Sequence, residues 1–155
     1  MSEKTTKVGT LGEQLTERWL QLQNYESLEQ NWRSRWGEID LIARNKVDST
    51  IAFVEVKTRS HHNWDENGLR AIDSIKQQKI VQTASMYLAK HPQLADLPCR
   101  FDVALVRYQK LSKSADYGLV NFQGITRLDL GQSVVCDRYK LVLANYLQSA
   151  FDLSS

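Results

Sequence analysis

The sequence has few of the residues and segments that identify a class of protein directly, such as cysteines, prolines, glycines and long apolar runs. Among its 155 residues are only two cysteines, two prolines and seven glycines, which excludes a collagen-like chain and a disulfide framework. No run approaches the roughly 18 consecutive apolar residues that a membrane-spanning helix needs. The first ten residues contain no apolar stretch typical of a secretory signal. We therefore expect a protein of the cytoplasm that spans no membrane.

An excess of charge of either sign is also missing. Twenty basic and 18 acidic side chains give a formal net charge of +2, so the bulk charge does not indicate nucleic acid as a partner. The hydrophobic share of 42% is enough at this length for a core without disulfides. We expect one domain over residues 1–155, with a core over 9–125 and a C-terminal element over 126–155.

The cysteines and histidines of the sequence do not have the spacing of a zinc site. Cys99 and Cys136 lie far apart in no CxxC or Cys/His pattern, so we expect reduced thiols with a structural role. The pair His61-His62 has no further ligand near it in the sequence, which favours a polar loop over a metal site. Zinc chemistry is therefore not predicted.

The periodicity of apolar residues predicts a layered α/β domain. Helices are predicted over 12–22 and, ended by Pro92, over 69–90. Strands are predicted over 25–36, 38–43, 51–57, 101–108 and 118–125, with a turn at 45–50 and a polar loop at 60–68. The stretch 134–151 begins like a strand and continues with a helical pattern. The order α-β-β-β-α-β is followed by an extra strand and this C-terminal element.

The strand predicted over 51–57 carries charge in an apolar setting. Because strand side chains alternate between faces, Glu55 and Lys57 share a face with Ile51 and Phe53. Both faces are mostly apolar, which predicts a central strand covered on both sides. Buried charges of this kind are costly unless they are paired or bind a metal ion.

Carboxylates of the preceding strand are predicted to lie beside Glu55. If Arg44 pairs with Ile51 across the turn, Asp40 lies opposite Glu55. The same register places Glu38 opposite Lys57. Opposed side chains have Cβ atoms roughly 5 Å apart, and two carboxylates at that distance repel unless a cation lies between them. Oxygen ligands favour Mg²⁺ or Mn²⁺ over zinc.

Two simpler explanations of these charges stay open. The hairpin could be exposed, with its charges on a solvated face, although the opposite face of strand 51–57 is equally apolar. An ion pair between Glu38 and Lys57 would neutralise part of the charge. That pair would leave the juxtaposition of Asp40 with Glu55 unexplained, so the hairpin is the candidate site.

The hairpin resembles a known nuclease signature. An acidic residue on one strand, followed by Glu-x-Lys on the next, is similar to the PD-(D/E)XK motif, here Asp40 with Glu55-Val56-Lys57. Ile39 stands where the motif has a proline that its members often lack. Longer strings resemble the YraN family of uncharacterised bacterial proteins and cover most of residues 9–107. These strings are Gly12-Glu13, Asn31-Trp32-Arg33, and the stretches 37–42, 53–59 and 100–103.

The resemblance implies a restriction-endonuclease-like fold related to the archaeal Holliday junction resolvases. Its core is αβββαβ, with a mixed central sheet flanked by helices. It also implies metal-dependent hydrolysis of phosphodiester bonds. Asp40, Glu55 and the carbonyl of Val56 would hold Mg²⁺ or Mn²⁺, and Lys57 would orient a water or stabilise charge on the phosphoryl oxygens.

Further acidic residues are expected around this centre. Glu38 could bind a second ion or a water on the metal. Glu13 matches an acidic position that members of the superfamily direct toward the metal, and a capping-box role in the first helix is an equal alternative. Asp102 is expected either to support the site or to form an ion pair.

Basic residues near the hairpin are candidates for nucleic-acid contacts. Arg33 and Arg35 share a strand face and could meet phosphates, and Arg59 follows the Glu-x-Lys lysine on the site face. Lys76 matches a basic position of related nucleases, with a solvated lysine as the alternative. Tryptophans in this region, such as Trp32, are expected in the core, and stacking on a base is the alternative.

The leading prediction is a Mg²⁺-dependent endonuclease acting on DNA rather than RNA, with branched or single-stranded DNA as candidate substrates. The alternative is a non-catalytic accessory protein that binds nucleic acid. A pure protein-interaction domain would leave the acidic cluster unexplained. Cutting both strands of a duplex or junction would favour a homodimer.

Overall fold

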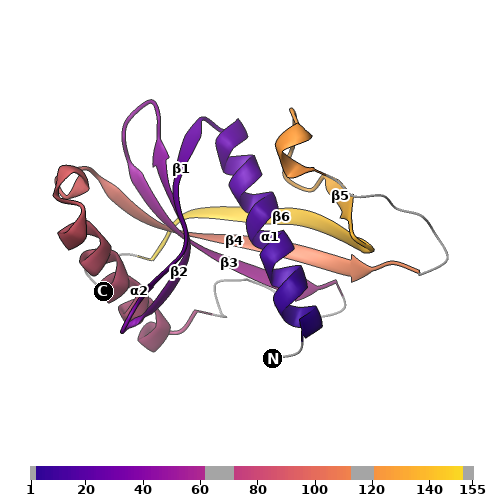
Figure 1. Cartoon of the computed structure of the whole chain (residues 1–155), viewed down its shortest axis with the longest axis horizontal. Helices are drawn as coiled ribbons and strands as arrows, with labels where there is room; N and C mark the ends of the chain where they lie inside the picture. Colours follow the sequence, from indigo (N-terminus) through magenta and orange to yellow (C-terminus); the bar gives the residue numbers. More distant parts are fainter. Residues whose placement is uncertain (1–2, 62–71, 113–120, 152–155) are drawn as a thin grey trace.

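Six strands form one mixed sheet in the computed structural model, which describes residues 3–61, 72–112 and 121–151 (Figure 1). The strand order is β1-β2-β3-β4-β6-β5. The elements are α1 (Glu3–Leu22), β1 (Tyr25–Ser34), β2 (Gly37–Asn45), β3 (Ile51–Ser60), α2 (Ser74–Lys90), η2 (Pro92–Leu94), β4 (Cys99–Lys110), η3 (Phe122–Gly124), β5 (Ser133–Cys136) and β6 (Tyr139–Phe151). Strands β3 and β4 are parallel, and the other paired strands are antiparallel.

The element order confirms the predicted αβββαβ core. Helix α1 leads into the β1-β2-β3 meander, and α2 connects β3 to its parallel neighbour β4. A crossover helix is the usual link between parallel strands because such strands cannot be joined by a tight turn. The architecture is that of a restriction-endonuclease-like core. None of the described helices is long and apolar enough to cross a membrane.

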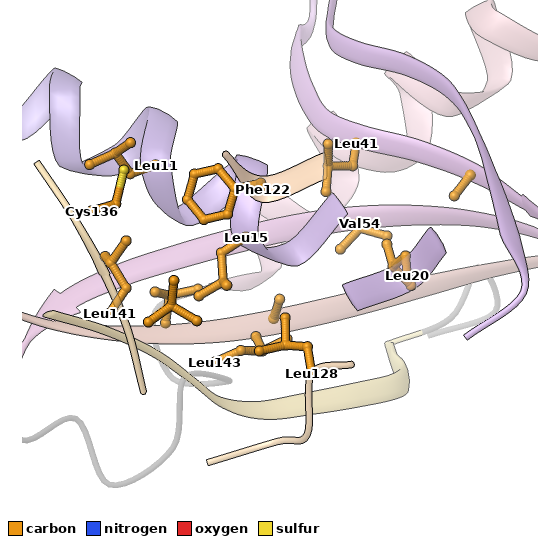
Figure 2. Close-up of a cluster of buried hydrophobic side chains, with 14 of the residues drawn as sticks. Leu11, Leu15, Leu20, Leu41, Val54, Phe122, Leu128, Cys136, Leu141 and Leu143 are labelled. Carbon is orange, nitrogen blue, oxygen red and sulfur yellow. The ribbon is translucent and has the colours of Figure 1, made fainter. Parts of the chain in front are cut away.

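Alternation along β3 supplies two cores, one on each face of the sheet. Val54 points into a cluster with Leu15 of α1, and Figure 2 shows this cluster with leucines of α1 and β6 around it. Phe53 points the other way, into a cluster with Ile80 and Tyr87 of α2. The prediction that strand 51–57 is central and covered on both sides is therefore confirmed.

The hairpin of β2 and β3 has the predicted register at its turn. Arg44 pairs with Ile51, and the ladder continues as far as Leu41 opposite Val54. The predicted continuation is not part of this ladder, which contains neither Asp40 opposite Glu55 nor Glu38 opposite Lys57. On its other side, β2 pairs with β1, and Glu38 forms an ion pair with Arg33 there.

Several element bounds differ from the predictions. The first helix begins at Glu3 rather than residue 12, and the strand predicted to end at 57 continues to Ser60. Helix α2 begins at Ser74, where the carboxylate of Asp73 accepts a hydrogen bond from the N–H of Lys76 at 2.8 Å. Residues 62–71, which include most of the predicted polar loop and part of the second predicted helix, lie outside the described residues.

The C-terminal predictions are the least accurate. Phe122–Gly124 is a short 3-10 turn rather than a strand, and residues 118–120 lie outside the described part. No helix forms over 134–151 in the described chain, because β5 and β6 make an antiparallel hairpin. Its turn residues Asp137 and Arg138 have φ of 48° and 69°, the left-handed conformation of tight hairpin turns. Cys99 is exposed and Cys136 is buried.

Gly12 allows α1 to lie directly against β3. A Cβ at this position would overlap Oγ1 of Thr58, whereas a Cβ at Gly9 of the same helix would meet open space. We expect Gly12→Ala to lower the free energy of unfolding by about 1–3 kcal/mol through overpacking. Gly9→Ala is the matched control and should be neutral or stabilising by up to about 1 kcal/mol.

Urea unfolding monitored by circular dichroism measures both variants. Thr58→Ala removes the overlapping hydroxyl, so the double variant Gly12→Ala/Thr58→Ala should recover most of the lost stability. Equal effects of Gly12→Ala and Gly9→Ala would contradict the close packing of α1 on β3.

Candidate active site

The candidate site lies where β2 and β3 separate. Beyond the pair of Leu41 with Val54, the carboxylate of Asp40 accepts a hydrogen bond from the N–H of Val56 at 2.8 Å. A side chain thus bonds to a backbone group of the next strand at the point where the β2–β3 ladder ends. Asp40 is held at the split between the two strands, within reach of groups on both faces of the sheet.

Glu55 enters the site from the α2 face. It is only 4% exposed, and its Oε2 lies 3.6 Å from Nζ of Lys76. Its other oxygen, Oε1, is buried without a hydrogen-bond partner among the described residues. A buried carboxylate oxygen left unsatisfied is costly, so this atom points to a cation or donor that completes the site.

The ionisation of the site reflects its burial. Burial, reinforced by the charge of Asp40, raises the pKa of Glu55 to about 7. Burial also raises the pKa of Asp40 above its ordinary value. Burial and the neighbouring ammonium of Lys76 lower the pKa of Lys57 to about 8. Each shift disfavours the charged form, and a bound cation would favour the charged carboxylates.

A cleft of about 430 Å³ opens from Asp40 on the α1 face of the sheet. Glu13 and Glu38 line it, and the amide of Asn31 bridges them when its nitrogen faces the carboxylates. That nitrogen then donates to Oε1 of Glu38 at 2.6 Å and to Oε2 of Glu13 at 3.1 Å. Burial and the proximity of Asp40 raise the pKa of Glu13 to about 8. The capping-box alternative for Glu13 is wrong, because α1 begins ten residues earlier at Glu3.

The oxygen donors of this site fit a hard divalent cation. Within the described residues, no three acidic, histidine or cysteine side chains are arranged as a ready-made metal site. Mg²⁺ does not require such a set, because it is commonly held by one or two carboxylates and keeps several waters. Asp40 and the unsatisfied oxygen of Glu55 supply that minimal set, with the carbonyl of Val56 as a further candidate.

The four basic residues predicted to contact nucleic acid have different partners in the structure. Nε of Arg33 lies 3.3 Å from Glu38, and Lys76 contacts Glu55 as described above. The guanidinium of Arg35 lies over the ring of Trp36 at 4.8 Å. Arg59 donates to the carbonyl of the residue before it at 3.3 Å. Arg33 and Lys76 are thus held by carboxylates of the site itself.

Trp32 of β1 and Trp36 of the following turn differ in burial. Trp32 packs edge-on against Tyr87 of α2, with ring centroids 5.2 Å apart, as predicted for a core residue. Trp36 is 38% exposed, which corrects the prediction of a core position. Trp36 lies in the turn between β1 and β2, outside both hydrophobic clusters.

Asp102 forms a buried ion pair away from the carboxylates of the site. Both its oxygens accept from Nε of Arg100, at 2.9 and 3.0 Å, and it also accepts from Tyr146 and the N–H of Ser149. Of the two predicted roles, the ion pair is the one that the contacts support.

Asn31 and Thr58 were missed as residues that shape the site. Asn31 has φ of 50°, a conformation that asparagine tolerates better than most residues. That conformation accompanies its bridge between the two glutamates, and the signal in the sequence was a lone asparagine inside a strand pattern. Thr58 could be found only from its packing against Gly12.

We expect the stability of the metal-free protein to fall as pH rises from about 5 to about 8, by about 2 kcal/mol. The pKa values of Glu55 and Glu13, about 7 and about 8, exceed their ordinary values. The folded chain therefore binds more protons than the unfolded chain in this range, and their loss destabilises it. The lowered pKa of Lys57, about 8, acts in the opposite direction only at higher pH.

Thermal unfolding with and without Mg²⁺ or Mn²⁺ measures this effect. The ion should raise the Tm more at pH 8 than at pH 5.5, and Glu55→Gln should reduce both the pH dependence and the effect of the ion. A Tm that rises steadily from pH 5 to pH 8 without metal would contradict the clustering of these carboxylates.

A family model and individual relatives assign the chain to the same protein family. Residues 12–106 match the family described as "Uncharacterised protein family UPF0102". A UPF0102 protein of Acaryochloris marina is 42% identical, over 97% of this chain and 92% of that protein. Another, from Synechocystis, is 46% identical over 94% of this chain and 98% of its own length. The matched region runs from Gly12 in α1 to Val106 in β4, so it contains every residue of the candidate site.

Proposed function

We propose that this chain, which belongs to the uncharacterised protein family UPF0102, the YraN family, is a divalent-metal-dependent endonuclease acting on DNA. The observation that carries the proposal is the unsatisfied Oε1 of buried Glu55, beside Asp40 and Lys57 at the split between β2 and β3. Two carboxylates and a lysine close together could hold a divalent cation and stabilise negative charge on a phosphate, which would support phosphodiester hydrolysis.

The two carboxylates would hold the ion from different strands. Asp40 is fixed by its hydrogen bond from Val56, so its second oxygen can bind a cation without losing that contact. Glu55 would contribute Oε1, which has no other partner in the described chain. A divalent cation held there would polarise a phosphate oxygen and make a bound water a stronger nucleophile at neutral pH.

Lys57 would act next to the scissile phosphate. It is 9% exposed, and its pKa of about 8 leaves it mostly protonated at neutral pH. As an ammonium it can stabilise negative charge that develops on the phosphoryl oxygens, or orient the attacking water. Glu13 and Glu38, bridged by Asn31 along the adjoining cleft, could bind a water of the metal ion.

A cleavage assay tests the proposal. Purified protein is incubated with linear duplex, single-stranded and four-way-junction DNA, in Mg²⁺, in Mn²⁺ or in EDTA. We expect cleavage of at least one substrate in either metal and none in EDTA. Binding of these DNAs without cleavage under every metal condition would contradict the nuclease proposal and favour the non-catalytic accessory role.

A further inference from the structure

Trp36 is exposed at the tip of the β1–β2 hairpin, whereas the other tryptophans of the described residues are packed. Trp19 and Trp32 pack against the two cores, whereas Trp36, in the turn between β1 and β2, is 38% exposed. The guanidinium of Arg35 lies 4.8 Å from its ring centroid. The packing of the sheet does not require an exposed indole with a guanidinium over its ring.

The tip is fixed against α2 rather than projecting freely. Oγ of Ser34 lies 3.1 Å from Oγ1 of Thr83, and a Cβ built at Gly37 would lie 4.0 Å from Cβ of Lys79. Ser34 thus joins this tip to α2, and Gly37, the residue after Trp36, lies near Lys79, which is exposed on α2.

Two lysines connect this tip to the site. Lys79 and Lys76 are three residues apart on α2, so their Cβ atoms are neighbours at about 5–6 Å. Lys76 reaches Glu55 at 3.6 Å. Lys79 and Lys76 therefore place positive charge on α2 between the hairpin tip that carries Trp36 and Glu55, the carboxylate proposed to bind the metal ion.

We infer that Trp36, Arg35 and Lys79 form a subsite for an unpaired nucleotide of the substrate. The base would stack on the indole, and the phosphates that follow would meet Lys79 and Lys76 on the way to the site. Aromatic platforms combined with a positively charged track are the usual means of binding single strands. The inference rests on the proposed function and specifies its substrate class, a nucleic acid with unpaired nucleotides next to the cleaved bond.

The occupant is a nucleotide rather than a second protein because of the charge around the indole. Arg35 lies over the ring, and Lys79 lies near the adjacent Gly37. Ile75, 64% exposed and four residues before Lys79 on α2, adds exposed apolar surface to the same helix. A nucleic acid is complementary to these groups, because its phosphates are negatively charged and its bases are flat rings that can stack on the indole.

Binding in EDTA tests the inference without any need for cleavage. Fluorescence anisotropy measures the Kd of the full chain for a labelled single-stranded oligonucleotide and for a blunt duplex of the same sequence. Trp36→Ala should weaken single-strand binding on the order of 10-fold, the size of one stacked base, and leave duplex binding nearly unchanged. Trp36→Tyr should retain most of the affinity. Val47→Ala, at a residue 79% exposed in the other hairpin turn, is the control and should change neither Kd.

The possible failures are distinguishable. An equal change of both Kd values for Trp36→Ala, or no change, would overturn the subsite and leave the nuclease proposal standing. A change in oligomeric state by light scattering, with single-strand binding intact, would assign Trp36 to a protein interface and also overturn it. A wild-type protein that binds no nucleic acid would refute the proposed function and this inference together.

Discussion

Asp40→Asn and Glu55→Gln are each expected to reduce DNA cleavage on the order of 1000-fold or more. Changes that only touch the partners of metal ligands already cost about 10–100-fold, and these two replace the ligands themselves. Each amide keeps the shape of the carboxylate, and the side-chain oxygen of the Asp40→Asn variant would still accept the hydrogen bond from Val56. The expected loss therefore comes from the missing charge on the cation position rather than from unfolding.

Steady-state cleavage of the best substrate, with circular dichroism to confirm folding, measures both variants. Asp129→Asn is the matched control, because Asp129 is exposed and pairs only loosely with Arg127, at 3.7 Å. It should cut like the wild type. Full activity of Asp40→Asn would show that the cleavage arises from another site or from a contaminant.

Asp102→Ala is expected to lower the free energy of unfolding by about 3–5 kcal/mol. Asp102 is fully buried and accepts hydrogen bonds from Arg100, Tyr146 and the N–H of Ser149. Its removal leaves the largely buried guanidinium of Arg100 without its carboxylate, and it leaves two donors from β6 unsatisfied. Since β4 and β6 lie side by side in the sheet, the loss should affect the whole fold.

Chemical denaturation measures this effect, with Asp129→Ala as the control at an exposed ion pair. The control should change stability by less than about 1 kcal/mol, as exposed pairs generally do. Asp102→Asn retains an acceptor and should lie between the two. A loss below about 1 kcal/mol for Asp102→Ala would contradict the structural role of this ion pair.

The sequence was sufficient for the order of the αβββαβ core elements, from α1 to β4. The apolar residues of 51–57 identified β3, and the assumed pairing of Arg44 with Ile51 is the one that forms. It was not sufficient for the split that follows. At that split the N–H of Val56 donates to the side chain of Asp40, a contact that no periodic pattern records. The predicted pairs of Asp40 with Glu55 and of Glu38 with Lys57 therefore do not occur in the ladder.

The missed features depend on contacts between distant segments. The helical pattern read in the second half of 134–151 is overridden by pairing of β6 with β4 along its length. The bridge that Asn31 makes between Glu13 and Glu38 joins α1, β1 and β2, which come together only in the folded chain. Local propensity is a weak guide where tertiary pairing decides.

Diffraction from crystals grown with Mn²⁺, using the anomalous signal of the metal, tests most directly whether Asp40 and Glu55 share a cation. We expect a Mn²⁺ peak at the split between β2 and β3, with oxygens of both carboxylates within about 2.6 Å of it. Carboxylates more than roughly 8 Å apart, with no ion between them, cannot share one metal at such ligand distances and would contradict the proposed site.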